Sequence, residues 1–461
     1  MFTMHFNGDE PLYEALYEHI KDAVATGAMR EGEKLPSKRD LARHLGLSVN
    51  TVTAAYDQLV DEGYLIAKER VGYFVAEIEN LHKKIAPAPA PAAPAREAPA
   101  YDYDFDLNKN ADYRFPDNHF KKCLQWAAEQ KEPLNRREKE GLQELRDAVA
   151  DYLKASRGVD VSAEDILLSA GMEYLLLILF ALLPKDAPFR LENPGYIGLK
   201  KIFEQNSVPY DFMAVDEAGV DPDALTGERS IYLVTPSHQF PTGSILRVDR
   251  RIKLLNHVKA TGSYIIEDDY DSEYKYYGRP IPALKSLDGV DRVIYMSNFS
   301  KSLSPTLRIS FMVLPRPLMA RYRHLSPGMN CPIPNLVQLA LARYMREGHF
   351  ERRLNRQRKI YDERRKIAAE AFLGDDLFSV DDKRAGMHFI LTCKVNGSEK
   401  ALLAYLKKHR IHMKGLSDFS QGEAQEGYPR LIVGYGNMSV DQLKEGLAEL
   451  KSLIKNFSAA S

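Results

Sequence analysis

Residues 297–310 read Ser-Asn-Phe-Ser-Lys-Ser-Leu-Ser-Pro-Thr-Leu-Arg-Ile-Ser. A single lysine, Lys301, stands among hydroxyl side chains, and Pro305 and Arg308 follow it. A lysine amine can form a Schiff base with an aldehyde, and hydroxyls with an arginine suit a phosphate group. Pyridoxal phosphate is both an aldehyde and a phosphate, so this stretch predicts a site for that cofactor.

A second stretch, 267–274, supplies acidic and phenolic groups. It reads Glu-Asp-Asp-Tyr-Asp-Ser-Glu-Tyr and follows an apolar run at 264–266, where a strand is expected. Ligands gather at the carboxyl ends of strands in α/β sheets. Either stretch alone is more often a surface lysine or a solvated loop. Their order, with Pro-Thr-Gly upstream at 241–243, favours a cofactor site.

The segment around these stretches alternates short apolar runs with helical patterns. Helices are expected at 172–183 and 250–261, and one long helical run extends from Asn335 to about Phe372. Strands are expected at 165–168, 189–191, 230–234, 264–266, 292–296 and 310–314, and later near 387–393 and 430–435. This alternation predicts an α/β fold whose mostly parallel sheet carries helices on both faces.

The N-terminal part has a different pattern. Apolar residues at helical spacing predict a helix over 11–26, and Ser37 and Ser48 are expected to begin helices at 38–45 and 49–62. Two β-prone runs, 64–67 and 72–75, follow. Residues 10–78 therefore predict a winged helix-turn-helix that places its second motif helix in the DNA major groove. The candidate DNA contacts are Lys38, Arg39, Arg43, Ser48, Asn50, Thr51, Thr53, Lys68 and Arg70.

Charge does not decide this assignment. Acidic residues outnumber basic ones over 1–80, and only 34–43 and 68–70 are locally basic. A DNA-binding surface must then be a local patch. A three-helix protein-interaction module is the alternative on spacing alone.

A stretch of alternating proline and alanine at 85–100 cannot form a core and favours an extended spacer. It separates an expected DNA-binding domain, 1–80, from a large domain, 101–461, through a linker at 81–100. The large domain is expected to bind the cofactor and the effector and to form the dimer.

Composition limits the cellular context. The three cysteines (Cys123, Cys331 and Cys393) are widely spaced and odd in number, which fits neither a disulfide framework nor a zinc site. We therefore expect a cytoplasmic protein without a metal. The longest apolar run, 174–183, is shorter than the about 20 residues that a membrane span needs, so it predicts a buried helix and no membrane partner.

Several motifs resemble known families. Pro11-Leu-Tyr and the stretches 32–42 and 48–59 resemble GntR-type winged helices, although Val49 replaces a frequent arginine, so one DNA contact is expected to be absent. The stretches around Lys301 and Tyr270 resemble fold-type I, aspartate aminotransferase-like enzymes. Over essentially its whole length the chain resembles MocR/GabR-type regulators, which fuse these two parts.

The resemblance implies a role for each motif residue. Lys301 would hold the internal aldimine, Asp268 would pair with the pyridine nitrogen, and Tyr270 with the phenolic oxygen. Asp268 is preferred to Asp269 because the family places this acid two residues before the tyrosine. Tyr196 would stack on the ring, or else pack on Pro194. Implied phosphate ligands are Ser300, Ser302 and Arg308, with backbone N–H groups at Gly171 and Met172 at a helix N-terminus.

Three further positions bear on ligand choice. Arg430 resembles the arginine that grips the effector carboxylate, or it is a salt-bridged strand residue. Phe240 stands where the enzymes carry an asparagine that contacts the cofactor. Gly198 stands where the GABA-responsive relative has an arginine, which weakens an assignment to GABA.

The function implied is that of a pyridoxal-phosphate-dependent transcriptional regulator. An amino-acid or amine effector would displace Lys301 to form an external aldimine, and a homodimer would present two winged helices to a double-stranded DNA operator. The alternatives are a working aminotransferase with an accessory DNA-binding domain, or a regulator that senses pyridoxal phosphate itself. The winged helix and Phe240 favour sensing over turnover.

Overall fold

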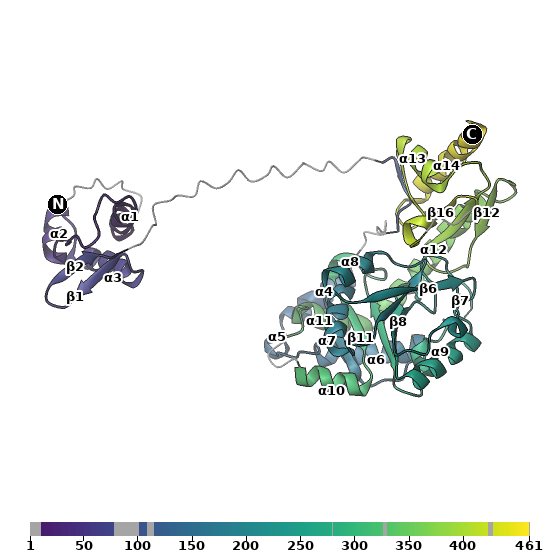
Figure 1. Cartoon of the computed structure of the whole chain (residues 1–461), viewed down its shortest axis with the longest axis horizontal. Helices are drawn as coiled ribbons and strands as arrows, with labels where there is room; N and C mark the ends of the chain where they lie inside the picture. The colour runs from purple at the N-terminus through teal and green to yellow at the C-terminus, as the bar shows by residue number, and fades with distance from the viewer. Residues whose placement is uncertain are drawn as a thin grey trace. The chain divides into compact units, whose positions relative to one another are not determined.

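The computed structural model describes residues 11–77, 101–107, 115–278, 280–325, 330–422 and 427–460. The chain divides into two units, Met1–Ala98 and Pro99–Ser461 (Figure 1). The proline- and alanine-rich linker predicted at 81–100 lies outside the described residues. Among the described helices, none combines the length and apolar character needed to cross a membrane.

The first unit is a helix-turn-helix with a two-stranded wing. Its elements are α1 (Leu12–Ala25), α2 (Lys38–Leu45), α3 (Val49–Asp61), β1 (Leu65–Lys68) and β2 (Gly72–Val75). Ser37 caps α2 by accepting a hydrogen bond from the Asp40 N–H, and Ser48 caps α3 in the same way. Gly46, at φ 69°, ends α2. The predicted winged helix-turn-helix is confirmed, with boundaries within a residue or two.

An eight-stranded sheet forms the centre of the second unit. Its strands, in sheet order, are β4 (Ile166–Ser169), β11 (Ser310–Val313), β10 (Val293–Asn298), β9 (Tyr264–Asp269), β8 (Ile231–Val234), β5 (Phe189–Asn193), β6 (Tyr210–Asp216) and β7 (Gly219–Val220). Pairing is parallel from β10 across to β6, while β11 and β7 run antiparallel to their neighbours. The predicted mostly parallel sheet is confirmed.

Helices cover both faces of this sheet. Alternate strand residues such as Tyr295 and Phe311 pack in one core with α4 (Asn118–Ala128), α6 (Gln143–Arg157) and α11 (Asn335–Arg346), and α9 (Val248–Thr261) covers the same face further along. The opposite set, including Leu233 and Ile266, packs beneath α7 (Met172–Leu182), α8 (Gly198–Gln205) and α10 (Arg316–Leu325). The short α5 spans Lys131–Asn135.

Two predictions about helices are corrected. The run 335–372 is not one helix, because Gly348 adopts a left-handed conformation (φ 69°) between α11 and α12 (His349–Glu370). The apolar run at 174–183 is only partly buried. Helix α7 buries one stripe and leaves Tyr174 and Leu177 exposed on its other side.

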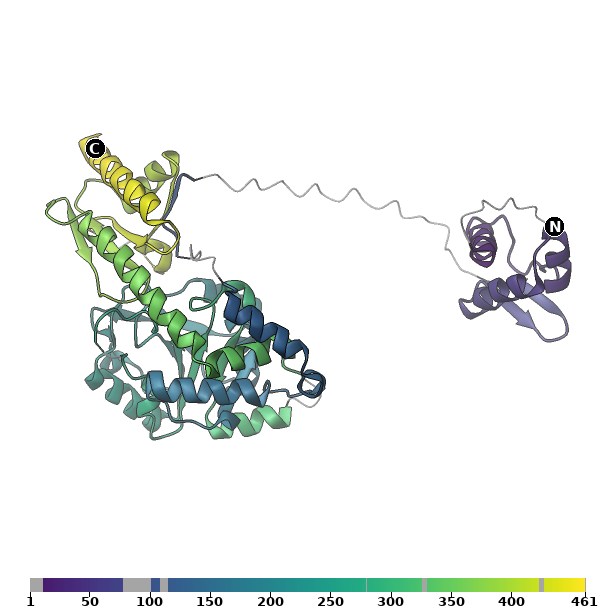
Figure 2. The ribbon, with the colours of Figure 1, turned by 180° about the vertical axis from the view of Figure 1, so that it is seen from behind.

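Helix α12 leads from the large sheet to a smaller α+β part, as Figure 2 shows. The smaller sheet has the order β12 (Phe378–Asp381), β13 (His388–Cys393), β16 (Arg430–Gly434), β15 (Lys414–Gly415), and it packs with α13 (Glu399–Lys408) and α14 (Val440–Ala460). The short strand β14 (Ile411–His412) pairs with β3 (Tyr103–Asp104), which brings the start of this unit beside its C-terminal part.

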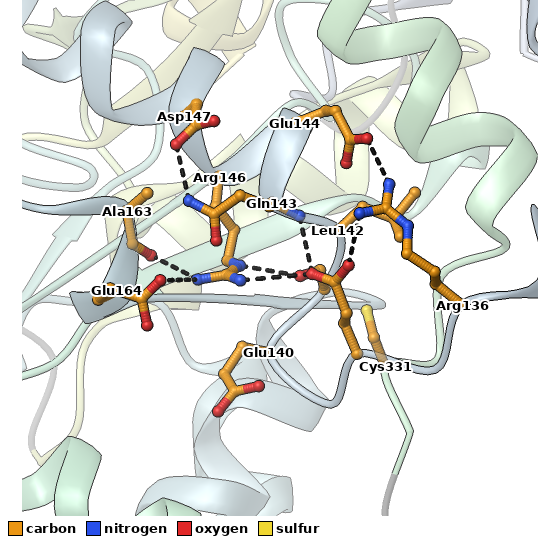
Figure 3. Close-up of polar contacts among 12 residues, drawn as sticks. Arg136, Glu140, Leu142, Gln143, Glu144, Arg146, Asp147, Ala163, Glu164 and Cys331 are labelled. Carbon is orange, nitrogen blue, oxygen red and sulfur yellow. Dashed lines mark hydrogen bonds and ion pairs between the residues drawn. The ribbon is translucent and has the colours of Figure 1, made fainter. Parts of the chain in front are cut away.

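A polar network fixes the loop that precedes α6 (Figure 3). The Arg146 guanidinium donates to the carbonyl oxygens of Gly141 and Ala163 and lies 3.7 Å from the Glu164 carboxylate. Gly141 has φ 94°, and a Cβ there would lie 2.5 Å from the Leu168 side chain. The loop thus passes directly over β4, and only glycine permits this approach.

Candidate functional site

A cavity of about 390 Å³ lies on the α7 and α8 face of the large sheet. Most of the predicted cofactor residues line it: Gly171, Met172, Tyr196, Asp268, Tyr270, Ser300, Lys301 and Arg308. The described residues that line the cavity do not include Ser302 or Arg430. Groups from four separate segments of the sequence (171–172, 196, 268–270 and 300–308) therefore meet in one cavity.

Lys301 lies just beyond the end of β10. Its Nζ donates a hydrogen bond to the Leu107 carbonyl oxygen at 2.6 Å. Burial lowers the pKa of the Lys301 amine from its usual value. Because an unprotonated amine is the nucleophile, this environment favours reaction with an aldehyde.

The two neighbouring aspartates of β9 face opposite sides of the sheet. Asp269 points toward α6, where its carboxylate lies 2.8 Å from Nε of Arg157 and accepts a hydrogen bond from the Tyr295 hydroxyl. Asp268 points into the cavity, and its Oδ1 atom is buried without a hydrogen-bond partner among the described residues. Burial raises the pKa of Asp268 well above its usual value. A cationic ring N–H bound here would supply the missing partner.

Tyr270 belongs to a buried cluster that the sequence analysis did not anticipate. Its hydroxyl oxygen lies 3.2 Å from Nδ1 of His238, and that nitrogen lies 2.9 Å from the Asp271 carboxylate. Burial raises the pKa of Tyr270 well above its usual value. Gly386 makes room for the cluster, since a Cβ there would lie 2.2 Å from the His238 ring. The sequence offered one signal for this cluster, because His238 stands only two residues before Phe240, a position already assigned to the cofactor site.

Anion-binding groups surround the N-terminus of α7. Gly171 precedes this helix at φ 105°, and a Cβ at Gly171 would lie 2.2 Å from Nη2 of Arg308. The guanidinium lies 2.5 Å from the Glu173 carboxylate. The Ser169 hydroxyl, at the end of β4 just before this helix, is buried without a partner among the described residues. The Ser302 hydroxyl is likewise buried without a described partner, but Ser302 does not line the cavity. Helix N–H groups, a guanidinium and hydroxyls together suit a phosphate.

Aromatic rings form one side of the cavity. Tyr196 is 53% exposed, and its ring lies 6.1 Å from Phe240 in a nearly perpendicular arrangement. Phe240 also contacts Tyr270 and Phe419 at centroid distances of 5.9 and 4.9 Å. A Cβ at Gly198 would lie 2.7 Å from the Tyr196 ring, so the glycine at this position leaves that ring room. Tyr196 is therefore accessible for stacking on a bound ring.

A second unanticipated group is Glu192, at the end of β5. It is buried and accepts hydrogen bonds from the Thr235 hydroxyl at 2.6 Å, the Thr235 N–H at 3.2 Å and the Gln239 amide at 3.2 Å. Burial outweighs these bonds and raises the pKa of Glu192 to about 7. Its carboxyl group lines the cavity beside Tyr196.

Arg430 is the first residue of β16 and pairs across the sheet with Thr392. Its backbone N–H donates to the Glu399 carboxylate at 3.1 Å, and its side chain is half-buried. The smaller sheet instead brings His388 to the cavity, where Nε2 lies 2.9 Å from the Pro241 carbonyl oxygen. Burial lowers the pKa of His388 to about 4. The carboxylate-binding role of Arg430 stays a prediction.

In the winged helix, the predicted DNA contacts differ in their surroundings. Lys38 lies 2.7 Å from the Asp57 carboxylate and sits over the Tyr73 ring, so it stabilises this unit itself. The hydroxyls of Ser48 and Thr51 lie 2.8 Å apart within the cap of α3. The other predicted contacts are exposed or half-buried: Arg39, Arg43, Asn50, Thr53, Lys68 and Arg70.

Comparisons with known proteins agree with both units. Residues 12–75 match the family described as bacterial regulatory proteins, gntR family, and residues 103–450 match aminotransferase class I and II. Relatives are the uncharacterized HTH-type regulator YdeL of Bacillus subtilis (34% identical, covering 97% of both chains), the probable rhizopine catabolism regulatory protein MocR of Rhizobium meliloti (30%; 98% of this chain, 95% of that one) and the pyridoxine biosynthesis regulator PdxR of Corynebacterium glutamicum (30%; 95% of both).

Among solved structures, the α-aminoadipate aminotransferase LysN of Thermus thermophilus, complexed with N-(5'-phosphopyridoxyl)-L-leucine, has a TM-score of 0.66 and 25% identity. The match covers 78% of this chain and 93% of that chain. An aminotransferase class I and II domain implies pyridoxal phosphate as the cofactor. The residues present fit it, since a buried amine, an unpartnered buried carboxylate and the anion-binding groups at α7 match its aldehyde, ring nitrogen and phosphate.

Proposed function

This chain belongs to the gntR-family HTH-type transcriptional regulators that carry an aminotransferase class I and II domain, and on that basis we propose that it senses an amino-acid or amine effector through Lys301. The observation that carries the proposal is the meeting of Lys301, Asp268 and Tyr270 in one cavity beside the N-terminus of α7. Pyridoxal phosphate, when bound, supplies an aldehyde that reacts with amines and a ring that withdraws electrons.

The predicted cofactor ligands that line the cavity would then each have a role in binding or proton balance. Arg308 and the N–H groups at Gly171 and Met172 would hold the phosphate, with Ser300 beside them. Asp268 would keep the ring nitrogen protonated, and Tyr196 would stack on the ring. The burial that lowers the pKa of Lys301 would keep its amine available in the unprotonated, nucleophilic form.

The sensing step must be coupled to DNA binding to regulate transcription. An effector bound at Lys301 would lie against both the large sheet and the smaller α+β part, because His388 and Phe419 of the latter also line the cavity. An effector shifts the protein only as far as it binds one arrangement better than another. A homodimer, implied by the family resemblance, would present two winged helices to two half-sites of an operator.

Two other functions remain as competing proposals. Lys301, Asp268 and Tyr270 are also the groups that transamination needs, so an active aminotransferase is the first. The relative PdxR is named for regulation of pyridoxine biosynthesis, which favours sensing of the cofactor itself as the second.

The test is the absorbance spectrum of the purified, cofactor-loaded protein during titration with amino acids and amines. A spectrum that shifts with one compound, and persists, supports sensing. Complete conversion that a keto acid reverses with turnover would make the protein an aminotransferase. Loss of operator binding on cofactor removal alone, with no response to any amine, would favour sensing of the cofactor.

A further inference from the structure

The cavity that contains Lys301 continues beneath α8, away from the predicted cofactor ligands. Five apolar side chains line this extension, which we call the α8 recess: Leu191, Leu199, Ile202, Phe212 and Leu233. None of these residues has a role in the proposed cofactor site.

The recess has a floor of strands and a roof of helix. Leu233, Leu191 and Phe212 are direct cross-strand neighbours on β8, β5 and β6, in that order. They face the same side of the sheet, where Leu199 and Ile202 of α8 cover them. The row forms one continuous apolar surface that runs from β8 across β5 to β6, toward the β7 edge of the sheet.

The far part of the recess, at Phe212, lies too far from Asp268 to hold the cofactor ring. Asp268 is on β9, and β8 and β5 separate that strand from β6, which carries Phe212. Neighbouring strands lie about 4.8 Å apart, so Phe212 is roughly 14 Å from β9. A ring anchored at Asp268 and stacked on Tyr196 leaves the far part of the recess for another molecule.

Carboxyl groups, rather than cations, border the mouth of the recess. Glu192 is buried there, and Asp268 and Asp271 face the same cavity. The cation on α8, Lys200, lies at the rim, 3.3 Å from the Gln421 amide oxygen and 3.8 Å from Glu204. A carboxylate placed among the five apolar side chains would lose its hydration without a described cationic partner, which is costly.

We propose that the α8 recess holds the apolar body of the effector, whose amino group reaches Lys301 in the same cavity. The effector class is therefore an amine or amino acid with an aliphatic or aromatic chain, rather than a short compound with a distal carboxylate. This inference rests on the proposed function, because it needs an amine that reacts at the site.

A matched set of probes tests the chemistry. The full-length, cofactor-loaded protein is titrated with propylamine, hexylamine and 6-aminohexanoate, and the affinity is read from the absorbance change and, independently, by calorimetry. Burial of apolar chain should tighten binding roughly fourfold for each added CH₂ group. Hexylamine should also bind at least about tenfold more tightly than 6-aminohexanoate, which differs from it by the terminal carboxylate.

Variants locate the effect. Ile202→Trp fills the recess from its roof and should abolish the chain-length dependence while the response to propylamine remains. Ile252→Trp, on α9 and 44% exposed outside the cavity, is the matched control and should behave like the parent. If Ile202→Trp does not fold, Phe212→Ala enlarges the recess and should shift the preference to longer amines.

The outcomes separate this inference from the proposed function. Equal affinity for all three probes, or tighter binding of 6-aminohexanoate, overturns the recess assignment and leaves effector sensing intact. An unchanged chain-length series in Ile202→Trp also overturns it. A cofactor-loaded protein that responds to no amine at all overturns both.

Discussion

Nδ1 of His238 lies 2.9 Å from the Asp271 carboxylate, and the Tyr270 hydroxyl lies 3.2 Å from the same nitrogen. All three side chains lie at the cavity or directly behind it. The histidine ring thereby fixes where the phenol of Tyr270 sits.

We predict that His238→Ala destabilises the protein by about 1–3 kcal/mol, because it leaves the buried Asp271 carboxylate without its partner. Urea unfolding of the cofactor-loaded protein measures this. His409→Ala, at the exposed end of α13, is the control and should change little. The pH at which the absorbance of the bound cofactor changes should also move in His238→Ala only.

Lys301→Ala should keep its fold and lose the visible absorbance that the parent acquires with pyridoxal phosphate. The reason is that no other buried amine is available among the described residues that line the cavity. Absorbance after gel filtration measures retention, with Lys253→Ala on α9 as the control. A variant that stays yellow would remove Lys301 from its assigned role.

The raised pKa of Glu192 predicts that the stability of the protein depends on pH. Burial raises the pKa of its carboxyl group from 4.5 to about 7, so the folded state holds the proton more tightly than the unfolded state. The contribution of Glu192 to the free energy of unfolding is fully present below about pH 4.5, and it is lost as the pH rises toward about 7. Glu192→Gln should therefore flatten the fall in unfolding free energy between pH 5 and 7, by up to about 3 kcal/mol. Glu228→Gln, at an exposed position, should keep the parent's slope.

Gly171→Ala should weaken binding of pyridoxal phosphate by tenfold or more. The added Cβ would lie 2.2 Å from Nη2 of Arg308 and would displace that guanidinium from the N-terminus of α7. Gly262→Ala also places an alanine at a positive φ (68°), although in the milder left-handed helical region, and it has no atom within 4 Å of the added carbon. Equilibrium titration of both variants with pyridoxal phosphate separates local backbone strain from loss of the anion site. If the two variants bind pyridoxal phosphate with equal affinity, the assignment of the phosphate site to the N-terminus of α7 is contradicted.

Arg39→Ala should weaken operator binding and lower the salt slope by about one, as expected for the loss of one phosphate contact. Lys38→Ala should behave differently. It loses the contact with Asp57 and the Tyr73 ring, so thermal stability of the winged helix should fall as well. Band shifts over a salt series, with melting curves, distinguish the two. An unchanged slope in Arg39→Ala would contradict this contact.

Local sequence signals predicted most of the fold. The caps Ser37 and Ser48 and the stop at Gly46 act within a few residues, so helix boundaries in the winged helix followed directly. The break at Gly348 was missed because helical periodicity continues on both sides of it. Tyr174 and Leu177 were assigned to the interior because an apolar run alone does not show which side of a helix is covered.

The candidate site was predictable only in part. Lys301, Asp268 and Tyr270 stand in short motifs whose chemistry is legible from the sequence. The contacts made by His238, Glu192 and Leu107 join residues that are 32 to 194 positions apart, and no local pattern encodes such pairs. In the structure, Asp269 differs from Asp268 because it binds Arg157 of α6, which lies 112 positions away in the sequence.

Helix α12 serves two hydrophobic cores at once. Phe350 and Leu354, in its first turns, pack into the core beneath the large sheet, while Tyr361 and Ala368 pack into the core of the smaller sheet. A helix of 22 residues is held by a continuous ladder of hydrogen bonds, so melting one half costs the other its support. The second unit is thus expected to show a single cooperative thermal transition, although it is built on two separate sheets.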